Sequence, residues 1–283
     1  MVQSRATSVW TRPSAGRSVV HNPHMTFRQP TTPFSAPARP ELTGGRRIGV
    51  LVSHGFTSTP ASVKEWAEAL AARGYAVEAP LLPGHGTTWQ AMNRTTFADY
   101  YGEIVRVFEK LRGDTDAVVV GGLSMGGTLA LRLAADRPEH VAGVVAVNPA
   151  VALHRFDVKL APVISRILPS YPAIASDVKK EGVVEDAYER TPLKAANSQF
   201  KAWKQLISDL PRVTAPLLYL RSTEDHVVDG ASEPVILGNI SSRDVTVVRL
   251  ENSYHVATID NDAPTIIEES AAFIDRVTAP PAG

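Results

Sequence analysis

One stretch in the middle of the chain limits the folds that it can adopt. Residues 117–120 are Ala-Val-Val-Val, a run typical of a buried strand. Gly122-Leu123-Ser124-Met125-Gly126 follows, and residues 128–137 then have the composition of a helix that stops before Pro138. A strand, a tight turn and a helix in succession hold the serine hydroxyl clear of the sheet, so this stretch predicts a nucleophilic serine at Ser124.

The residues around Ser124 fit that interpretation. Side chains at positions 122 and 126 would collide with the neighbouring strand and helix, which explains the two glycines. The Met125 N–H would point to the place where an oxyanion forms, at the positive end of the helix dipole. The pentapeptide alone also fits an ordinary glycine-rich turn before a helix. Whether Ser124 is a nucleophile or part of such a turn therefore depends on the other residues of the chain.

The composition bounds the class of protein. With 283 residues, 44% of them apolar, the chain is long enough for one large α/β domain with an insertion. Lys+Arg and Asp+Glu both number 29, which argues against a nucleic-acid partner. The absence of cysteine excludes disulfides and thiolate chemistry. No apolar run is long enough to cross a membrane or to form a secretory signal, and we expect a cytoplasmic protein.

The N-terminal part of the chain differs from the remainder. Residues 1–40 are rich in Ser, Thr, Pro and Arg without periodicity, so we expect a disordered or loosely attached segment. A transit peptide would also be rich in Arg and poor in acids, but its amphipathic helix is opposed by the prolines. Met25 is an alternative start of translation. A first short strand is predicted at residues 34–36.

Strand and helix patterns alternate along most of the chain. This alternation predicts a mostly parallel sheet with helices on both faces, formed by residues 41–148 and 215–283. In such sheets, ligands bind beyond the C-terminal ends of the strands. The predicted strands are 47–52, 75–79, 117–120, 141–147, 216–220 and 245–250, and the predicted helices are 60–73, 97–111, 128–137, 230–237 and 263–277.

The alternation breaks between residues 149 and 214. Apolar residues crowd positions 153–171, a polar helix is predicted at 178–188, and a second helix at 193–210. No strand is evident, so we expect a helical cap over the C-terminal edge of the sheet. The alternative is an ordinary crossover helix, which is usually much shorter than this segment.

A serine nucleophile needs a base, and a histidine base needs a carboxylate to orient it. In this arrangement the partners follow in the order Ser, acid, His, each just past the end of a strand. Asp225 follows strand 216–220 and His255 follows strand 245–250, so these two are the predicted acid and base. The alternatives are Glu224 and Asp229 for the acid, and His54, His85 and His226 for the base. A second oxyanion donor is expected in the loop after strand 47–52, at the Phe56 N–H.

Together these motifs resemble the α/β-hydrolase superfamily over roughly residues 34–278. The residues that carry the resemblance are His54-Gly55-Phe56, Pro83-Gly84-His85-Gly86, Gly122-Leu123-Ser124-Met125-Gly126, Thr223-Glu224-Asp225 and Tyr254-His255. With Thr191-Pro192-Leu193-Lys194, they resemble more narrowly the bacterial carboxylesterase and monoacylglycerol lipase group. The resemblance implies cofactor-free and metal-free hydrolysis of short- to medium-chain esters or monoacylglycerols. By position it makes Ser124 the nucleophile, Asp225 the acid, His255 the base, and the N–H groups of Phe56 and Met125 the oxyanion donors.

The substrate is less constrained than the chemistry. We expect Phe56, Ile164, Leu168 and Trp203 to line an acyl pocket; alternatively they only hold the cap together. The same triad would serve a thioester, amide, peptide or lactone hydrolase, or an acyltransferase. A ligand-binding receptor or an inactive pseudo-enzyme on the same scaffold remains a further alternative. The expected partner is a small-molecule ester, with transient contact to a lipid surface left open.

Overall fold

The computed structural model describes residues 31–154, 156–173 and 176–280, without the side chains of residues 156–161. Of the segment 1–40 that is predicted to be disordered or loosely attached, residues 1–30, with the alternative start at Met25, lie outside the described residues. Residues 31–40 are described, and Phe34–Ala36 pair with residues 77–79 of the sheet. The first described strand follows directly at Phe34–Ala36, where the sequence predicts it.

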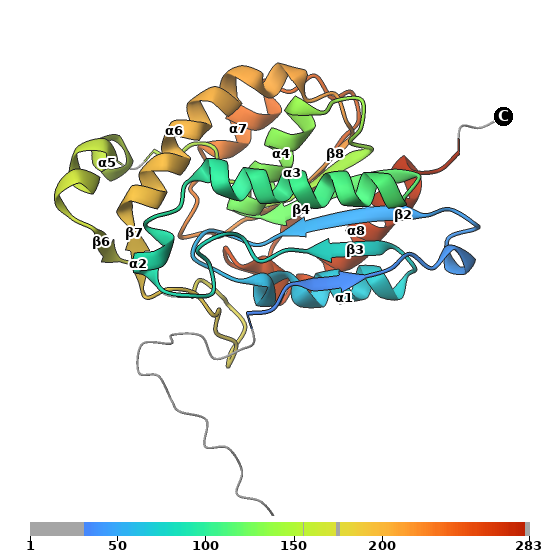
Figure 1. The fold of residues 1–283 in the computed structure, drawn as a ribbon, viewed down its shortest axis with the longest axis horizontal. Coiled ribbons are helices and arrows are strands. Elements are labelled where there is room, and N and C mark those ends of the chain that lie inside the picture. Colours follow the sequence, from blue (N-terminus) through green and yellow to red (C-terminus); the bar gives the residue numbers. More distant parts are fainter. Residues whose placement is uncertain (1–30, 155, 174–175, 281–283) are drawn as a thin grey trace, which may run out of the picture.

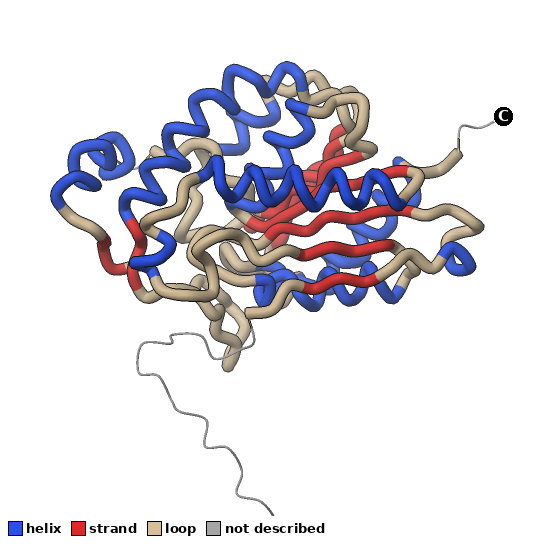
Figure 2. The backbone as a smooth tube through the Cα atoms, viewed as in Figure 1, coloured by secondary structure: helices blue, strands red, loops and turns tan. Residues whose placement is uncertain are grey.

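A seven-stranded sheet forms the centre of the molecule, in the order β1-β3-β2-β4-β5-β8-β9 (Figures 1 and 2). Strand β1 pairs antiparallel with β3, and all other pairs in this sheet are parallel. The mostly parallel α/β fold is therefore confirmed. The strands are β1 Phe34–Ala36, β2 Ile48–Ser53, β3 Ala76–Ala79, β4 Ala117–Leu123, β5 Gly143–Val147, β8 Leu217–Ser222 and β9 Val245–Leu250.

Helices cover both faces of the sheet, so the central strands are buried throughout. One apolar cluster joins β4 and β5 to helices α3 and α4, and a second joins β2 and β4 to α1 and α8. The helices of the core are α1 Lys64–Ala72, α2 Trp89–Met92, α3 Phe97–Asp114, α4 Met125–Asp136, α7 Ser232–Leu237 and α8 Ala263–Val277, with 3₁₀ turns η1 Pro40–Leu42, η2 Pro60–Val63, η3 Leu210–Arg212 and η4 Ala257–Ile259.

Helix α3 is rotated slightly from the orientation that the sequence predicts. A capping box between Thr96 and Asp99 starts it. Tyr100 is fully buried, while Tyr101, a member of the predicted apolar stripe, is only partly buried. The phenol of Tyr101 instead donates a hydrogen bond of 2.5 Å to Asp136 of α4. A tyrosine can serve at such a boundary because it is apolar along the ring and polar at its tip.

The chain between β5 and β8 forms α5 Phe156–Ile167, β6 Ser170–Pro172, β7 Arg190–Pro192 and α6 Leu193–Asp209. These elements lie together beyond the C-terminal ends of β2 and β3 (Figure 1). We refer to residues 149–214 as the cap segment.

Two predictions for the cap segment are wrong. Strands β6 and β7 pair antiparallel where no strand was expected. Within the described part of residues 178–188 there is no helix. The backbone N–H groups of Lys179 and Lys180 instead donate to the Asp260 carboxylate at 2.7 and 2.8 Å. Tertiary hydrogen bonds thus replace the helical ones that the local composition suggests.

No helix among the described residues is long and apolar enough to span a bilayer. Within the same residues, no group of three or more His, Cys, Asp and Glu side chains could hold a metal ion.

Candidate active site

Ser124 occupies a strained turn between β4 and α4. Its backbone angles are φ 55° and ψ −115°, a conformation that costs a non-glycine residue roughly 1–3 kcal/mol. The turn is held by a hydrogen bond of 2.9 Å from the Ser124 N–H to the Val147 carbonyl. A Cβ atom at Gly126 would lie 2.1 Å from the Ser53 carbonyl oxygen, and one at Gly122 would lie 2.5 Å from the Gly126 carbonyl carbon. Only glycine therefore fits at either position.

The predicted base and acid are hydrogen-bonded to each other. His255 follows β9 and Asp225 follows β8, and His255 Nδ1 lies 2.9 Å from Asp225 Oδ2. The other carboxylate oxygen accepts the N–H groups of Val227 and Val228 at 2.9 and 2.8 Å. Because the ionised carboxylate only accepts, we assign the proton to Nδ1, which leaves Nε2 as the free acceptor nitrogen.

A buried arginine also binds Asp225. The Arg221 guanidinium donates to Asp225 Oδ2 at 2.6 Å and to the Val228 carbonyl at 2.6 Å. Burial alone would raise the pKa of the Asp225 carboxyl, but the adjacent His255 and then Arg221 lower this pKa to about 2. The carboxylate is thus ionised over the whole neutral range.

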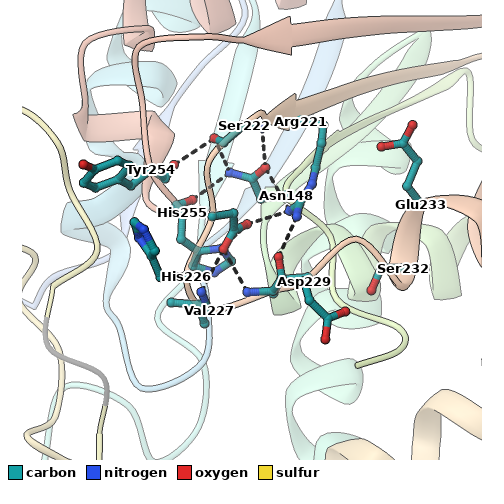
Figure 3. Close-up of polar contacts among 12 residues, drawn as sticks. Asn148, Arg221, Ser222, His226, Val227, Asp229, Ser232, Glu233, Tyr254 and His255 are labelled. Carbon is teal, nitrogen blue, oxygen red and sulfur yellow. Dashed lines mark hydrogen bonds and ion pairs between the residues drawn. The ribbon is translucent and has the colours of Figure 1, made fainter. Parts of the chain in front are cut away.

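Asn148 ties the loops of this site together. It lies fully buried at the end of β5 with a φ of 45°, a conformation that asparagine tolerates better than most residues. Its side-chain amide donates to Ser222 Oγ at 2.9 Å and to the His255 carbonyl at 2.8 Å, and it accepts the Ser222 N–H (Figure 3). Two consecutive residues therefore hold the two catalytic candidates: the Val147 carbonyl binds the Ser124 N–H, and the Asn148 side chain binds the His255 carbonyl. The sequence analysis did not identify Asn148, since its role depends on strand pairing.

The loop after β2 lies against the serine turn. A Cβ atom at Gly55 would lie 3.6 Å from Ser124 Cβ. His54 is fully buried, with Nδ1 2.9 Å from the Gly55 carbonyl and Nε2 accepting the Leu82 N–H at 3.2 Å. Burial lowers the pKa of His54 to about 4, against the opposing effect of the Gly55 carbonyl. A neutral His54 thus joins two loops, and the N–H of the next residue but one, Phe56, remains the predicted second oxyanion donor.

The alternative acids and bases have other partners. Glu224 pairs with Lys179 at 3.3 Å, and Asp229 accepts the N–H groups of His154 and Ala231. The exposed His226 is bound through Nδ1 to Asp177 at 2.7 Å. The geometry thus favours the predicted pair over its rivals.

The four predicted acyl-pocket residues do not form one cluster. Phe56 is half-buried on the main core, whereas Trp203 is 5% exposed and packs with Ala150 and Val228. Ile164 is half-buried on α5, and Leu168 is 47% exposed. Leu168 therefore belongs to the outer surface of the cap segment.

Glu185 is a candidate that the sequence analysis missed. Burial of its carboxyl raises the pKa of Glu185, while the nearby Ser58 hydroxyl and the His255 imidazole oppose that rise. Ser58 Oγ is buried and meets hydrogen-bond geometry with no described residue. Glu185 escaped notice because it falls within the stretch that was expected to be a polar helix. The structure instead brings a carboxyl group of the cap segment near His255.

The sequence model of the serine aminopeptidase, S33 family matches residues 45–262. The chain belongs to this family. The hydrolase is 40% identical over 245 residues to the thermostable monoacylglycerol lipase of Bacillus sp. (strain H-257), a match that covers 86% of this chain and 97% of the relative. It is 25% identical to the carboxylesterase of Bacillus subtilis (strain 168), with 84% and 97% coverage.

Solved structures agree with this assignment. A structure reported for the metagenome-derived lipolytic enzymes LipS and LipT superposes on the hydrolase with a TM-score of 0.82 at 39% identity. The match covers 87% of the hydrolase and 98% of that chain. The monoglyceride lipase of Saccharomyces cerevisiae has a TM-score of 0.74 at 14% identity, which supports the fold alone. The hydrolase is thus an α/β-hydrolase of the carboxylesterase and monoacylglycerol lipase group, and it is a carboxylic ester hydrolase.

Proposed function

We propose that the hydrolase cleaves monoacylglycerols and short- to medium-chain esters with Ser124 as nucleophile, His255 as base and Asp225 as acid. The observation that carries this assignment is the bond of 2.9 Å between His255 Nδ1 and Asp225 Oδ2. The strained Ser124 turn is tied to the same site, because the Val147 carbonyl accepts the Ser124 N–H and the side chain of Asn148, the next residue, donates to the His255 carbonyl. An imidazole oriented by a carboxylate and a serine on a strained strand-to-helix turn are the groups that acyl transfer by a triad requires.

The reaction proceeds in two halves. His255 Nε2 takes the proton of Ser124 Oγ as that oxygen attacks the ester carbonyl carbon, and the N–H groups of Phe56 and Met125 hold the resulting oxyanion. His255 then gives the proton to the departing alcohol oxygen, which leaves an acyl-serine. In the second half, water donates its proton to His255 and attacks the acyl carbon, and Ser124 leaves with that proton. Asp225 stays ionised throughout and stabilises the imidazolium.

Glu185 gives the alcohol side of the substrate a polar contact. A carboxyl group with a raised pKa near His255 supports binding of an alcohol that carries further hydroxyl groups. The buried Ser58 hydroxyl offers a second such contact. Glycerol has two free hydroxyls in a monoacylglycerol, whereas the alcohol of a simple alkyl ester has none. Support for this substrate class also comes from the 40% identity to a monoacylglycerol lipase.

The acyl side and the lipid surface involve the cap segment. Of the predicted acyl-pocket residues we assign Phe56 to the acyl chain, because Gly55 next to it lies against Ser124, whereas Trp203 packs in a separate cluster. The exposed apolar side chains of α5, β6 and the turn between them would touch an aggregate of substrate transiently; they are Val163, Ile167, Leu168 and Tyr171. A cytoplasmic location, expected from the sequence, stays a prediction.

Turnover of a monoacylglycerol and of p-nitrophenyl butyrate tests the assignment. Ser124→Ala should abolish both activities and labelling by a fluorophosphonate, with an unchanged circular dichroism spectrum. Glu185→Gln should lower kcat/KM for the monoacylglycerol up to about tenfold, the value of one hydrogen bond, with a smaller loss on the butyrate ester. An active Ser124→Ala variant would refute the triad, and equal losses of Glu185→Gln on both esters would refute the glycerol contact.

A further inference from the structure

A second buried carboxylate lies beside the triad, and it comes from the cap segment. Asp177 is 8% exposed. Its Oδ2 accepts the backbone N–H of His255 at 3.1 Å and the backbone N–H of His226 at 3.1 Å. Its Oδ1 lies 2.7 Å from His226 Nδ1. One carboxylate therefore joins the base to the residue that follows the acid.

The backbone of Asp177 adds a further bond to the same loop. Its carbonyl accepts the N–H of Val256 at 3.1 Å. Residue 177 thus binds two consecutive N–H groups of the loop that carries the imidazole. The direction of the imidazole depends on this backbone, because the His255 side chain has only two rotatable bonds. A displacement of about 1 Å at such a group is enough to cost about 10²-fold in rate.

The Asp177 carboxylate is surrounded by polar and charged groups. Its hydrogen bond and its charge raise the pKa of the exposed His226. Glu224 Oε1 lies 3.8 Å from Nε2 of His226. Tyr254 packs edge-on against the His226 ring, and the Lys179 ammonium lies over the face of the Tyr254 ring. Two backbone N–H groups and one imidazole satisfy Asp177, so its burial is compensated.

We propose that Asp177 is a positioning residue, which holds the His255 imidazole at the distance from Asp225 and Ser124 that catalysis needs. Because Asp177 belongs to the cap segment, this geometry also depends on the attachment of the cap segment to the core. The proposal rests on the proposed role of His255 as the base. It assigns Asp177 no contact with substrate. The effect of its loss should accordingly fall on kcat, because the turnover step depends on the placement of the imidazole.

The chain supplies a matched control in Asp260. This residue is 1% exposed, and its carboxylate accepts the N–H groups of Lys179, Lys180 and Tyr254 at 2.7 to 2.9 Å. Asp260 therefore attaches the same part of the cap segment to the same loop. Its bonds stop one residue short of His255, so it reports the attachment of the cap without the positioning of the base.

Kinetics of the full-length variants Asp177→Ala, Asp177→Asn and Asp260→Ala on p-nitrophenyl butyrate test the proposal. Asp177→Ala should lower kcat by about 10- to 100-fold with little change in KM. Asp177→Asn should recover most of that loss, because its amide oxygen still accepts both N–H groups. Asp260→Ala should lower the melting temperature as much as Asp177→Ala while losing far less kcat.

Several results would overturn the proposal. One is an unchanged kcat in Asp177→Ala. Another is an equal loss of kcat in Asp177→Ala and Asp260→Ala at equal melting temperature, since attachment of the cap would then explain both. If Asp177→Ala does not fold, Asp177→Leu takes its place, because leucine has a similar volume and no acceptor for the His255 N–H; a kcat no lower than that of Asp260→Ala would then overturn the proposal. The triad itself is judged separately, because Ser124→Ala would remain inactive even if Asp177 has no positioning role.

Discussion

Replacement of Arg221 by methionine should destabilise the protein far more than loss of an ordinary ion pair. The Arg221 side chain is 9% exposed and the Asp225 side chain is not exposed at all. Methionine keeps the apolar stem but loses three hydrogen bonds from a charged donor: two of 2.6 Å, to Asp225 and to the Val228 carbonyl, and one of 3.4 Å to Asn148 Oδ1. At about 1.5–3 kcal/mol for each of the two short bonds, the loss is roughly 3–6 kcal/mol.

Urea denaturation at neutral pH measures this cost, with Arg47→Met as the control. Arg47 pairs with Asp116 at 3.0 Å, but the two side chains are 56% and 49% exposed, so its loss should cost less than about 1 kcal/mol. The double variant Arg221→Met, Asp225→Asn should lose less stability than the sum of the two single variants, because no buried charge remains. A loss for Arg221→Met within error of that for Arg47→Met would refute the reasoning.

Two further predictions concern the serine turn and acid stability. Gly126→Ala should prevent folding, since its Cβ has no room beside Ser53. Gly102→Ala, exposed on α3 with open space around it, should raise stability by about 1 kcal/mol in urea denaturation. The lowered pKa of Asp225, about 2 against 3.8 for the free group, contributes stability that is fully present above about pH 4 and is lost as the pH falls to about 2. This contribution to the free energy of unfolding is about 2 kcal/mol. In Asp225→Asn the urea midpoint should therefore fall less between about pH 4 and pH 2 than in the wild-type protein. The same pH dependence in the variant and in the wild type would contradict this prediction.

Local patterns were sufficient for the core of the fold. Strand β9 and helix α8 have the bounds that their periodicity predicts, Val245–Leu250 and Ala263–Val277. Chain order then brought Asp225 and His255 to one edge of the sheet, because parallel strands all end on the same side. The contact between these two residues was therefore predictable from topology before any distance was known.

The cap segment was less predictable because its conformation is set by distant residues. Residues 178–188 are polar enough for a surface helix, yet the Asp260 carboxylate, some 80 positions later, accepts the N–H groups of Lys179 and Lys180. Glu185 and Asp177 become recognisable only once this extended path is known. Likewise, whether Tyr100 or Tyr101 faces the core depends on Asp136 of a neighbouring helix.

The cap segment leaves the sheet after β5 and the chain returns as β8, and these two strands are direct neighbours. Another insertion of different length or shape could thus be spliced between them without changing any strand pairing, which makes this the natural place to exchange substrate preference between relatives. Such an exchange has one requirement. The new cap segment must place a hydrogen-bond acceptor at the backbone N–H of residue 255, or the variant will have a new pocket but a misplaced catalytic imidazole.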